Sequence, residues 1–230
     1  EPLINLLGEF GFNQSAIKTT DNGREIVLVK NFSEITNNIR EDFPIINARG
    51  KKKFLLSIKP EWHTKLFPDS ILNSESYDVL QDTSHTNSIF KTYVCFMDLS
   101  ELSNNDIIII YRTSDQPNRA WYRSVVTSVC TVEEVRSSEQ FENIKEYINS
   151  TETYSVFNEN ELLTWWDRRG RLYVLKMLYN AAFSRRLIRK NLIEDFGLDS
   201  SNYWGFFELS DVQFMNIIQA GGINESIVIN

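Results

Sequence analysis

Two stretches of the sequence, residues 57–62 and 111–123, place cationic, aromatic and hydroxyl side chains at the ends of apolar runs. Nucleic-acid-binding clefts use these types, because cations hold phosphates, aromatic rings stack on bases, and hydroxyls and amides read base edges. We therefore expect one cleft on which Lys59, Trp62, Tyr111, Arg112 and Arg123 converge. For a tryptophan such as Trp62 or Trp121, packing in a core or at an edge is the alternative role. The candidate ligand-binding residues are Ser57, Lys59, Trp62, Tyr111, Arg112, Ser114, Arg119, Trp121 and Arg123.

The charge distribution also points to a polyanionic partner. The net charge of −7 argues against a nonspecific nucleic-acid binder. Residues 168–190 nevertheless contain no acidic residue, and residues 49–65 form a second basic cluster, so a polyanion is expected to bind one face only. The alternative is that these cations are solvated or pair with acids elsewhere. The candidate residues of a nucleic-acid-binding rim are Arg168, Arg169, Arg171, Arg185, Arg186, Arg189 and Lys190.

No pattern of catalytic or metal-binding residues stands out. Cys95 and Cys130 lie in apolar runs, without another cysteine or a histidine at metal-ligand spacing. The two histidines, His63 and His85, have no neighbouring serine, cysteine or carboxylate pattern that would mark the base of a nucleophile. We expect His63 on the surface of a helix. The sequence therefore predicts no metal, no cofactor and no catalytic residue in this chain.

The composition is that of a folded protein. With 42% hydrophobic and 13% aromatic residues, 9 Gly and 5 Pro, it excludes a disordered or low-complexity chain. The longest aliphatic run, residues 107–110, is far shorter than the roughly 20 residues of a membrane helix, and no basic-then-apolar leader is present. We expect a soluble cytoplasmic protein without a membrane partner. Because the first residue is Glu1 and not Met, we also expect the chain to be part of a longer protein.

The first fifty residues predict a small N-terminal unit and a linker. Apolar spacing over residues 3–10 predicts a helix that stops at Gly11. Residues 15–19 and 24–30 flank a turn signal at 21–23 and predict a hairpin, in which the run 26–29 is expected to be buried. Residues 33–52 are polar and are expected to form a linker, with an uncertain helix near residues 32–40.

The remaining chain predicts an α+β domain with short, mostly antiparallel strands and helices at the rim. Strands are expected at residues 54–59, 92–97, 106–111, 121–129 and 171–177, with a long surface loop at 69–90. A helix is expected from Pro60, which suits a first helical turn, and another over residues 187–196. Three pairs with capping-box spacing predict helix starts: Thr131 with Glu134, Asn158 with Glu161, and Ser210 with Gln213.

From residue 53 onward the sequence resembles the PUA-like superfamily, in particular its ASCH and EVE branches and the version fused behind a GNAT domain. The matching segments are 56–63 (LSIKPEWH), 66–70 (LFPDS), 106–113 (DIIIIYRT) and 122–127 (YRSVVT), followed by 155–157 (SVF) and 174–177 (VLKM). The resemblance implies a small twisted β-barrel with a cleft that relatives use to bind RNA or modified bases.

The first 32 residues resemble the closing helix and strand pair of GNAT acetyltransferases. The matching segments are 6–12 (LLGEFGF) and 22–30 (NGREIVLVK). The Gly-rich turn with which that family binds the acetyl-CoA pyrophosphate is missing, and Leu7 stands where the family often has a tyrosine acid. We therefore expect this segment alone not to transfer acetyl groups.

These patterns together predict a GNAT-like C-terminal fragment at residues 1–32, a linker at 33–52 and a PUA-like domain at 53–230. The predicted function is binding of RNA or a modified base, as the C-terminal part of a GNAT acetyltransferase. The expected partners are RNA or modified nucleic acid and a GNAT catalytic domain or partner protein. The alternative is an ASCH-type amidohydrolase that acts on a modified nucleoside with a Lys, a Thr and a Glu. Lys59 matches, but residues 66–76 replace the Gly-x-Lys-x-x-Glu-x-Arg loop common in ASCH domains.

Overall fold

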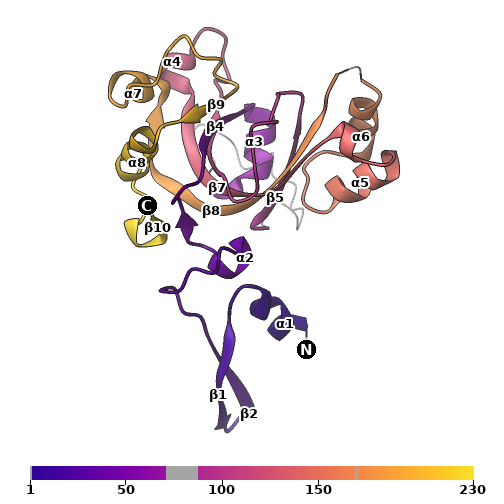
Figure 1. The fold of residues 1–230 in the computed structure, drawn as a ribbon, viewed down its shortest axis with the longest axis vertical. Helices are drawn as coiled ribbons and strands as arrows, with labels where there is room; N and C mark the ends of the chain where they lie inside the picture. Colours follow the sequence, from indigo (N-terminus) through magenta and orange to yellow (C-terminus); the bar gives the residue numbers. More distant parts are fainter. Residues whose placement is uncertain (1, 71–87, 169) are drawn as a thin grey trace.

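A six-stranded sheet forms the centre of the molecule (Figure 1). The computed structural model describes residues 2–70, 88–168 and 170–230. The strand order is β5-β8-β7-β6-β4-β9, and β4 and β6 are the one parallel pair among these neighbours. The strands are β4 (Lys53–Ile58), β5 (Phe90–Cys95), β6 (Ile107–Arg112), β7 (Val125–Ser137), β8 (Tyr173–Ile188) and β9 (Phe206–Leu209). The expected α+β class is confirmed.

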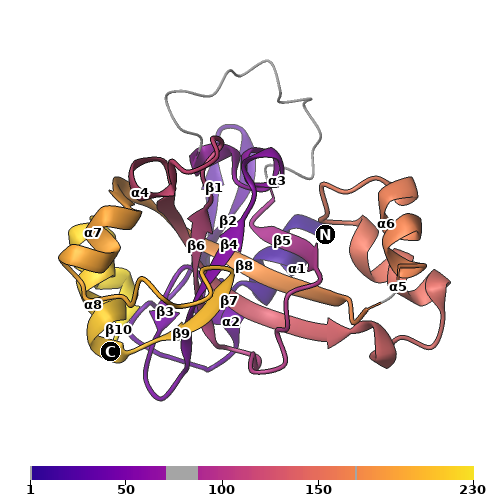
Figure 2. The same cartoon turned by 90° about the horizontal axis from the view of Figure 1, so that it is seen from above.

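Strands β4 and β6 are buried on both faces, which explains why their sequences are continuous apolar runs and not alternating ones. Leu56 faces one hydrophobic core, whereas its neighbour Leu55 faces a second core on the other side. Helices α3 (Pro60–Leu66), α5 (Ile144–Glu152) and α6 (Glu159–Trp166) contribute to the first core, and α7 (Arg189–Glu194) and α8 (Asp211–Ala220) to the second. Figure 2 shows α5 and α6 at one end of the curled sheet, α7 and α8 at the opposite end, and α3 between them.

The sheet curls strongly but does not close. Bulges interrupt the pairing of β7 with both of its neighbours, for instance between Val126 and Ser128 and between Val132 and Glu134, and bulges increase the bend and twist of long strands. Strands β5 and β9 remain edges, since no pairing between them exists among the described residues. The expected small β-barrel is therefore corrected to a curled sheet that stays open between β5 and β9 in the described part of the chain.

The N-terminal unit has the expected elements but not the expected burial. Helix α1 (Pro2–Glu9) and the hairpin of β1 (Asn13–Thr20) and β2 (Gly23–Val29) project from the sheet (Figure 1). The run 26–29 is not buried, because Ile26 and Val29 keep 40% and 51% of their surface exposed. Lys30 holds the unit together, since its Nζ donates to the carbonyl oxygen of Phe10 at 2.7 Å and to that of Phe43.

Residues 33–52, which we expected to be a linker, pack onto the sheet domain. The helix expected near residues 32–40 is one short turn, α2 (Ile39–Asp42). Strand β3 (Ile46–Asn47) pairs in parallel with β10 (Val228–Ile229), which follows the 3₁₀ turn η4 (Glu225–Ile227). The side chains of Ile46 and Ala48 are fully buried in the second core. In addition, Arg40 forms an ion pair with Glu133 of β7 at 2.6 Å. The segment therefore has a fixed place on the sheet domain.

Capping-box spacing predicted two helix starts correctly and one wrongly. The reciprocal hydrogen bonds of Asn158 with Glu161 open α6, and those of Ser210 with Gln213 open α8. The prediction for Thr131 is wrong, because Thr131 lies within β7, where pairing with β6 and β8 overrides the local signal.

Several boundaries also differ from the prediction. The strand expected from residue 121 begins at Val125, after the helical turn α4 (Ala120–Arg123). Strand β8 continues to Ile188 and leaves only a short α7, and a 3₁₀ turn, η3 (Ser138–Gln140), follows β7. The loop expected at 69–90 falls largely on residues 71–87, which lie outside the described residues, although the 3₁₀ turn η1 (Pro68–Ser70) precedes them. No helix in the described ranges is long and apolar enough to cross a membrane.

The packing of Ile46 gives a direct test of this arrangement. We expect Ile46→Ala to lower the free energy of unfolding by about 2–4 kcal/mol, because it leaves a cavity in the second core. The matched variant Ile26→Ala, in the exposed hairpin, should change it by less than about 0.5 kcal/mol. Urea denaturation of both variants measures the difference, and equal effects would contradict the packing of residues 33–52.

Candidate nucleic-acid interface

A pocket of about 680 Å³ lies where β4 ends and α3 begins, and we call it the β4–α3 pocket. Its walls come from four parts of the chain: the β4–α3 junction with Thr113 after β6, strand β5 with the residues that follow it, the end of α6, and the segment before β9. The lining residues are Ser57, Lys59, Tyr93, Val94, Cys95, Phe96, Met97, Thr113, Trp165, Arg168, Tyr203, Trp204 and Gly205.

Ser57 attaches one wall of this pocket to the central sheet. Its backbone N–H donates to the carbonyl oxygen of Gly205 at 2.8 Å, and its hydroxyl donates to the carbonyl oxygen of Trp204. The indole N–H of Trp204 donates to the carbonyl oxygen of Asp199 at 3.2 Å, and the guanidinium of Arg189 lies 4.3 Å from the centre of the Trp204 ring. Trp204 is therefore held from several sides, whereas the neighbouring Tyr203 keeps 72% of its surface exposed.

Two cations line the same pocket from different elements. Lys59 occupies the N-cap position of α3, where Pro60 begins the helix, and its side chain is exposed. Arg168 follows the end of α6, and its guanidinium lies 4.6 Å from the centre of the Phe96 ring. Neither forms an ion pair within the described ranges. Both charges are therefore available to an anion.

Five aromatic residues of the pocket supply ring surfaces of the size of a base. Trp165 is fixed by edge-on packing against Phe157, with ring centres 4.6 Å apart. Tyr93 and Phe96 come from β5 and the residues after it, and Tyr203 and Trp204 come from the segment before β9. Rings combined with cations form the pattern that binds single-stranded nucleic acid through stacking and phosphate contacts.

The cysteine of the pocket is not a nucleophile at neutral pH. Burial raises the pKa of the Cys95 thiol to about 12, and a hydrogen bond with the backbone of Met97 offsets only part of this rise. Thiol chemistry requires the thiolate, which is scarce at such a pKa. Cys95 therefore contributes apolar surface to the pocket.

Only part of the predicted ligand-binding set lines this pocket. Ser57 and Lys59 line it, but Trp62 packs against the first core, with its ring centre 4.8 Å from that of Phe157. Tyr111 and Arg112 are buried, and Tyr111 belongs to the second core. The expected convergence of Lys59 with Trp62, Tyr111, Arg112 and Arg123 on this pocket does not occur.

The remaining members of the predicted set lie in and after the loop that follows β6. The hydroxyl of Ser114 donates to the carbonyl oxygen of Gln116 at 2.7 Å, so its contacts are local. Arg119 and Trp121 lie at the start of α4, exposed and half-buried respectively. Arg123 forms a bidentate ion pair with Asp115, in which both N–O distances are 2.6 Å. None of these residues lines the β4–α3 pocket.

The basic residues of 168–190 do not share one rim, because β8 separates them. A strand of 16 residues spans roughly 50 Å when extended. Arg168 lies before it at the pocket, whereas Arg185 lies near its other end. Arg171 pairs with Glu139 at 3.1 Å and Lys190 with Glu194 at 3.6 Å. Arg169 lies outside the described residues. Arg185 itself lies within β8, so the expectation of one common rim is corrected.

Arg186 and Arg189 point into the structure instead of forming a free rim. The guanidinium of Arg186 donates to the carbonyl oxygens of Thr127 and Phe183 at 2.9 and 3.0 Å, and burial lowers its pKa. Arg189 lies over Trp204, so it supports the wall of the β4–α3 pocket from behind.

His63 is not on the helix surface as expected but fully buried. Its Nε2 lies 2.8 Å from the hydroxyl of Thr127, and Nδ1 has no hydrogen-bond partner. Burial, with further effect from the charges of Arg112 and Arg186, lowers the pKa of His63 to about 3. The imidazole is therefore neutral at physiological pH and acts as part of the packing between α3 and the sheet.

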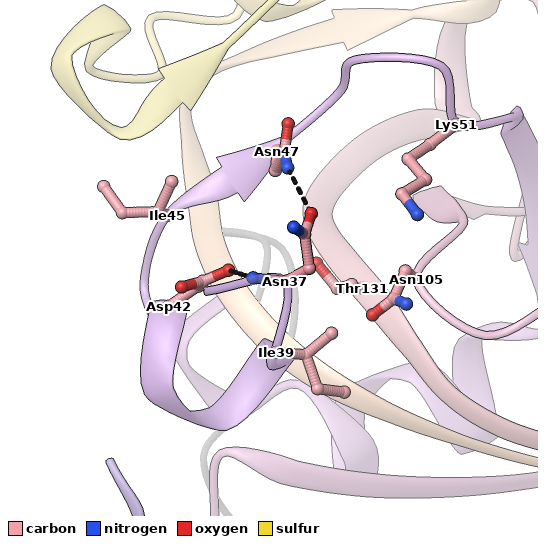
Figure 3. A pocket seen from close by; sticks show the side chains of 8 residues that line it. All are labelled: Asn37, Ile39, Asp42, Ile45, Asn47, Lys51, Asn105 and Thr131. Carbon is pink, nitrogen blue, oxygen red and sulfur yellow. Dashed lines mark hydrogen bonds between the residues drawn. The ribbon is translucent and has the colours of Figure 1, made fainter. Parts of the chain in front are cut away.

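A smaller cavity of about 20 Å³ lies between α2 and β3 and is too small for a ligand (Figure 3). It has room for about one water molecule. Asp42 points along one side of it and accepts hydrogen bonds from the backbone N–H groups of Thr36 and Asn37 at 2.8 and 2.9 Å. The side-chain amide of Asn47 donates to that of Asn37 at 3.3 Å. This cavity belongs to the packing of residues 33–52 on the sheet.

Five aromatic residues of the β4–α3 pocket were not predicted from the sequence. Tyr93, Phe96, Trp165, Tyr203 and Trp204 line it, and none was among the predicted ligand-binding residues. A usable signal was present in the adjacent aromatic residues at 203 and 204, directly before Gly205 and a strand. The glycine matters, because a Cβ there would lie 2.3 Å from the ring of Tyr203.

Comparison with known proteins defines the fold. No family model and no curated protein matches the sequence. A mutant ZmASCH protein from Zymomonas mobilis aligns with a TM-score of 0.50 and 9% identity, over 74% of this chain and 96% of that chain. Human THYN1 protein in complex with 5-methylcytosine containing DNA aligns with a TM-score of 0.41 and 7% identity, over 76% and 99%. The chain therefore has an ASCH-type fold, as the PUA-like resemblance predicted.

The buried state of His63 predicts how stability depends on pH. Its pKa is lower in the folded than in the unfolded protein, so the unfolded state binds the extra proton first. The free energy of unfolding should be highest above pH 6.5 and fall by up to about 1.4 kcal/mol per pH unit below it. His63→Gln, whose amide can still reach Thr127, should remove this slope between pH 6.5 and 5. Denaturation at several pH values tests this, and an unchanged slope would contradict it.

Proposed function

We propose that this protein binds nucleic acid by taking one base, of RNA or of a flipped, modified nucleotide, into the β4–α3 pocket. The observation that carries the proposal is the presence of Lys59 and Arg168 in one pocket with five aromatic residues. A base stacks on the rings while its phosphate remains near the cations at exposed positions. The ASCH-type fold and the PUA-like resemblance agree with this use of the pocket.

The charge of the chain supports a restricted interface. A body with a net charge of −7 repels a polyanion, so binding depends on places where cations lack acidic partners. Carboxylates already form ion pairs with Arg123, Arg171 and Lys190. These three cations therefore attract a phosphate less strongly. Lys59 and Arg168 are therefore the cations that we assign to phosphate.

The alternative, an ASCH-type amidohydrolase, has weaker support. Its expected set is a lysine, a threonine and a glutamate near the cleft. Lys59 and Thr113 both line the β4–α3 pocket, but none of the described residues that line it is a carboxylate. The Cys95 thiol is protonated at neutral pH because burial raises its pKa. The described residues of the pocket can therefore bind a ligand, but none of them is an activated nucleophile.

We also propose that residues 1–32 complete a GNAT-type sheet in a parent acetyltransferase. The support is the exposure of apolar side chains on α1 and the hairpin, where Leu3 keeps 66% and Val29 51% of its surface exposed. An isolated two-stranded hairpin is marginally stable and gains stability from a third strand or a covering helix. Sequencing the source gene tests this: an acetyl-CoA-binding segment encoded upstream supports it, and a start codon directly before Glu1 contradicts it.

The binding proposal predicts how affinity depends on salt. Lys59→Ala and Arg168→Ala should each weaken binding of a structured RNA or of a single strand with a modified base. Each should also reduce the slope of log affinity against log salt by about one, because one phosphate contact is lost. Arg24→Ala, which removes an exposed cation of the hairpin, is the matched control and should leave both quantities unchanged.

Fluorescence titration at several salt concentrations is the measurement, since Trp165 and Trp204 line the pocket. If the wild-type protein binds no nucleic acid even at low salt, the proposal is wrong. If Arg24→Ala lowers the affinity and the salt slope as much as the pocket variants do, binding is nonspecific and does not involve this pocket.

A further inference from the structure

A second cavity, of about 400 Å³, adjoins the β4–α3 pocket, and we call it the β9 pocket. The two share Met97 and Tyr203 as lining residues. The β9 pocket combines aromatic and apolar walls with carboxylates, and its lining residues are Met97, Asp98, Ser100, Glu101, Tyr203, Phe206, Phe207 and Glu208.

The two pockets have opposite charge. The β4–α3 pocket is lined by Lys59 and Arg168 and, among the described residues, by no carboxylate. The described lining of the β9 pocket contains three carboxylates and no basic residue. A phosphate is therefore repelled from the β9 pocket, whereas a cation next to aromatic faces and carboxylates is stabilised.

One carboxylate of the β9 pocket, that of Asp98, is held in its ionised state by hydrogen bonds. Asp98 accepts hydrogen bonds from the hydroxyl of Tyr173 at 2.7 Å and the backbone N–H of Ser100 at 3.0 Å, which lower its pKa to about 2. Glu208 lies 3.5 Å from the ammonium of Lys52. Glu101 forms no ion pair with any residue that the structure describes. Glu101 is therefore the carboxylate best suited to a cationic ligand group.

Tyr203 forms the wall between the two pockets. Its ring lies so close to Gly205 that a Cβ at that position would be 2.3 Å from Cε1, and most of the side chain is exposed. A ligand in the β4–α3 pocket and a group in the β9 pocket can therefore contact the same ring. This shared wall makes the two cavities parts of one site.

We propose that this joint site recognises a base that carries a positively charged aminoalkyl substituent. The inference rests on the proposed base-binding function. The base lies in the β4–α3 pocket with its phosphate near Lys59 and Arg168, and the ammonium group extends past Tyr203 toward Glu101. A nucleotide suits the site better than a basic peptide, because Lys59 and Arg168 repel further positive charge.

Three cytidine 5′-monophosphates test the inference by calorimetric titration at low salt: one unsubstituted, one with a 3-aminopropyl group on N4 and one with a 3-hydroxypropyl group there. The same series on adenosine 5′-monophosphate, substituted on N6, covers a purine. In at least one series the ammonium compound should bind about fivefold or more tightly than its hydroxyl counterpart, because length and shape are matched and only the charge differs.

Variants assign this preference to the β9 pocket. Glu101→Gln should reduce the ammonium preference to about twofold or less without changing the affinity for the hydroxyl compound. Glu152→Gln, which removes an exposed carboxylate at the end of α5, is the matched control and should keep the full preference. Tyr203→Ala should weaken binding of both substituted compounds.

The outcomes separate the two proposals. If the nucleotides bind but ammonium and hydroxyl compounds have equal affinity, the inference is wrong and the base-binding function stands. If the preference survives Glu101→Gln unchanged, the β9 pocket is not its source and the inference is also wrong. If no nucleotide of either series binds at low salt, base binding fails, and the inference fails with it.

Discussion

The two hydrogen bonds of Ser57 to the segment before β9 determine the shape of the candidate site. They connect Ser57 with residues 147 and 148 positions further along the sequence, and they continue the antiparallel pairing of β4 with β9 beyond its last regular pair. Lys59 follows two residues after Ser57, so the same strand end carries both the cation and the anchor of the aromatic wall. If this attachment were lost, Tyr203 and Trp204 would no longer be held in the same pocket as Phe96 and Arg168.

The central sheet makes this attachment possible because β4 and β6 are covered on both faces. The apolar residues of these strands alternate between the two cores. The polar residues that we assign to binding lie where the strands end. Lys59 and Thr113 both follow such ends, and the backbone N–H of Thr113 donates to the carbonyl oxygen of Ile58 at 3.0 Å. The hydrophobic sheet therefore carries polar groups where its inner strands end. Binding residues commonly lie on loops that a rigid scaffold positions in this way.

Local sequence signals predicted the elements of the fold well where packing agreed with them. The apolar runs of β4 and β6, Pro60 at the start of α3, and the capping pairs of α6 and α8 all correspond to the structure. The capping prediction at Thr131 was wrong because strand pairing outweighs a capping signal. The expected barrel is an open sheet because closure depends on the pairing of edge strands, which no local pattern specifies. The apolar run of β2 is exposed, since burial depends on what lies opposite a strand.

The candidate site was predictable in its two cations and in Ser57, but not in its aromatic residues. Lys59 was predicted from its place at the end of an apolar run and Arg168 from the basic run 168–190, whereas Tyr203 and Trp204 reach the pocket through pairing across the whole domain. Tyr111 and Arg112 were expected at the site because they end an apolar strand, but they lie on inward-facing positions of that strand. The position of a residue along its strand therefore predicted whether it lies near the site. The direction of its side chain determined whether it lines the β4–α3 pocket.

Photo-crosslinking tests the central claim most directly. An RNA that contains 4-thiouridine, irradiated with the protein and analysed by mass spectrometry, reports which side chains contact a base. The β4–α3 pocket predicts crosslinks at Tyr203, Trp204 or Phe96. Crosslinks confined to the region around Arg185 and α7, or absent altogether despite binding, would contradict it.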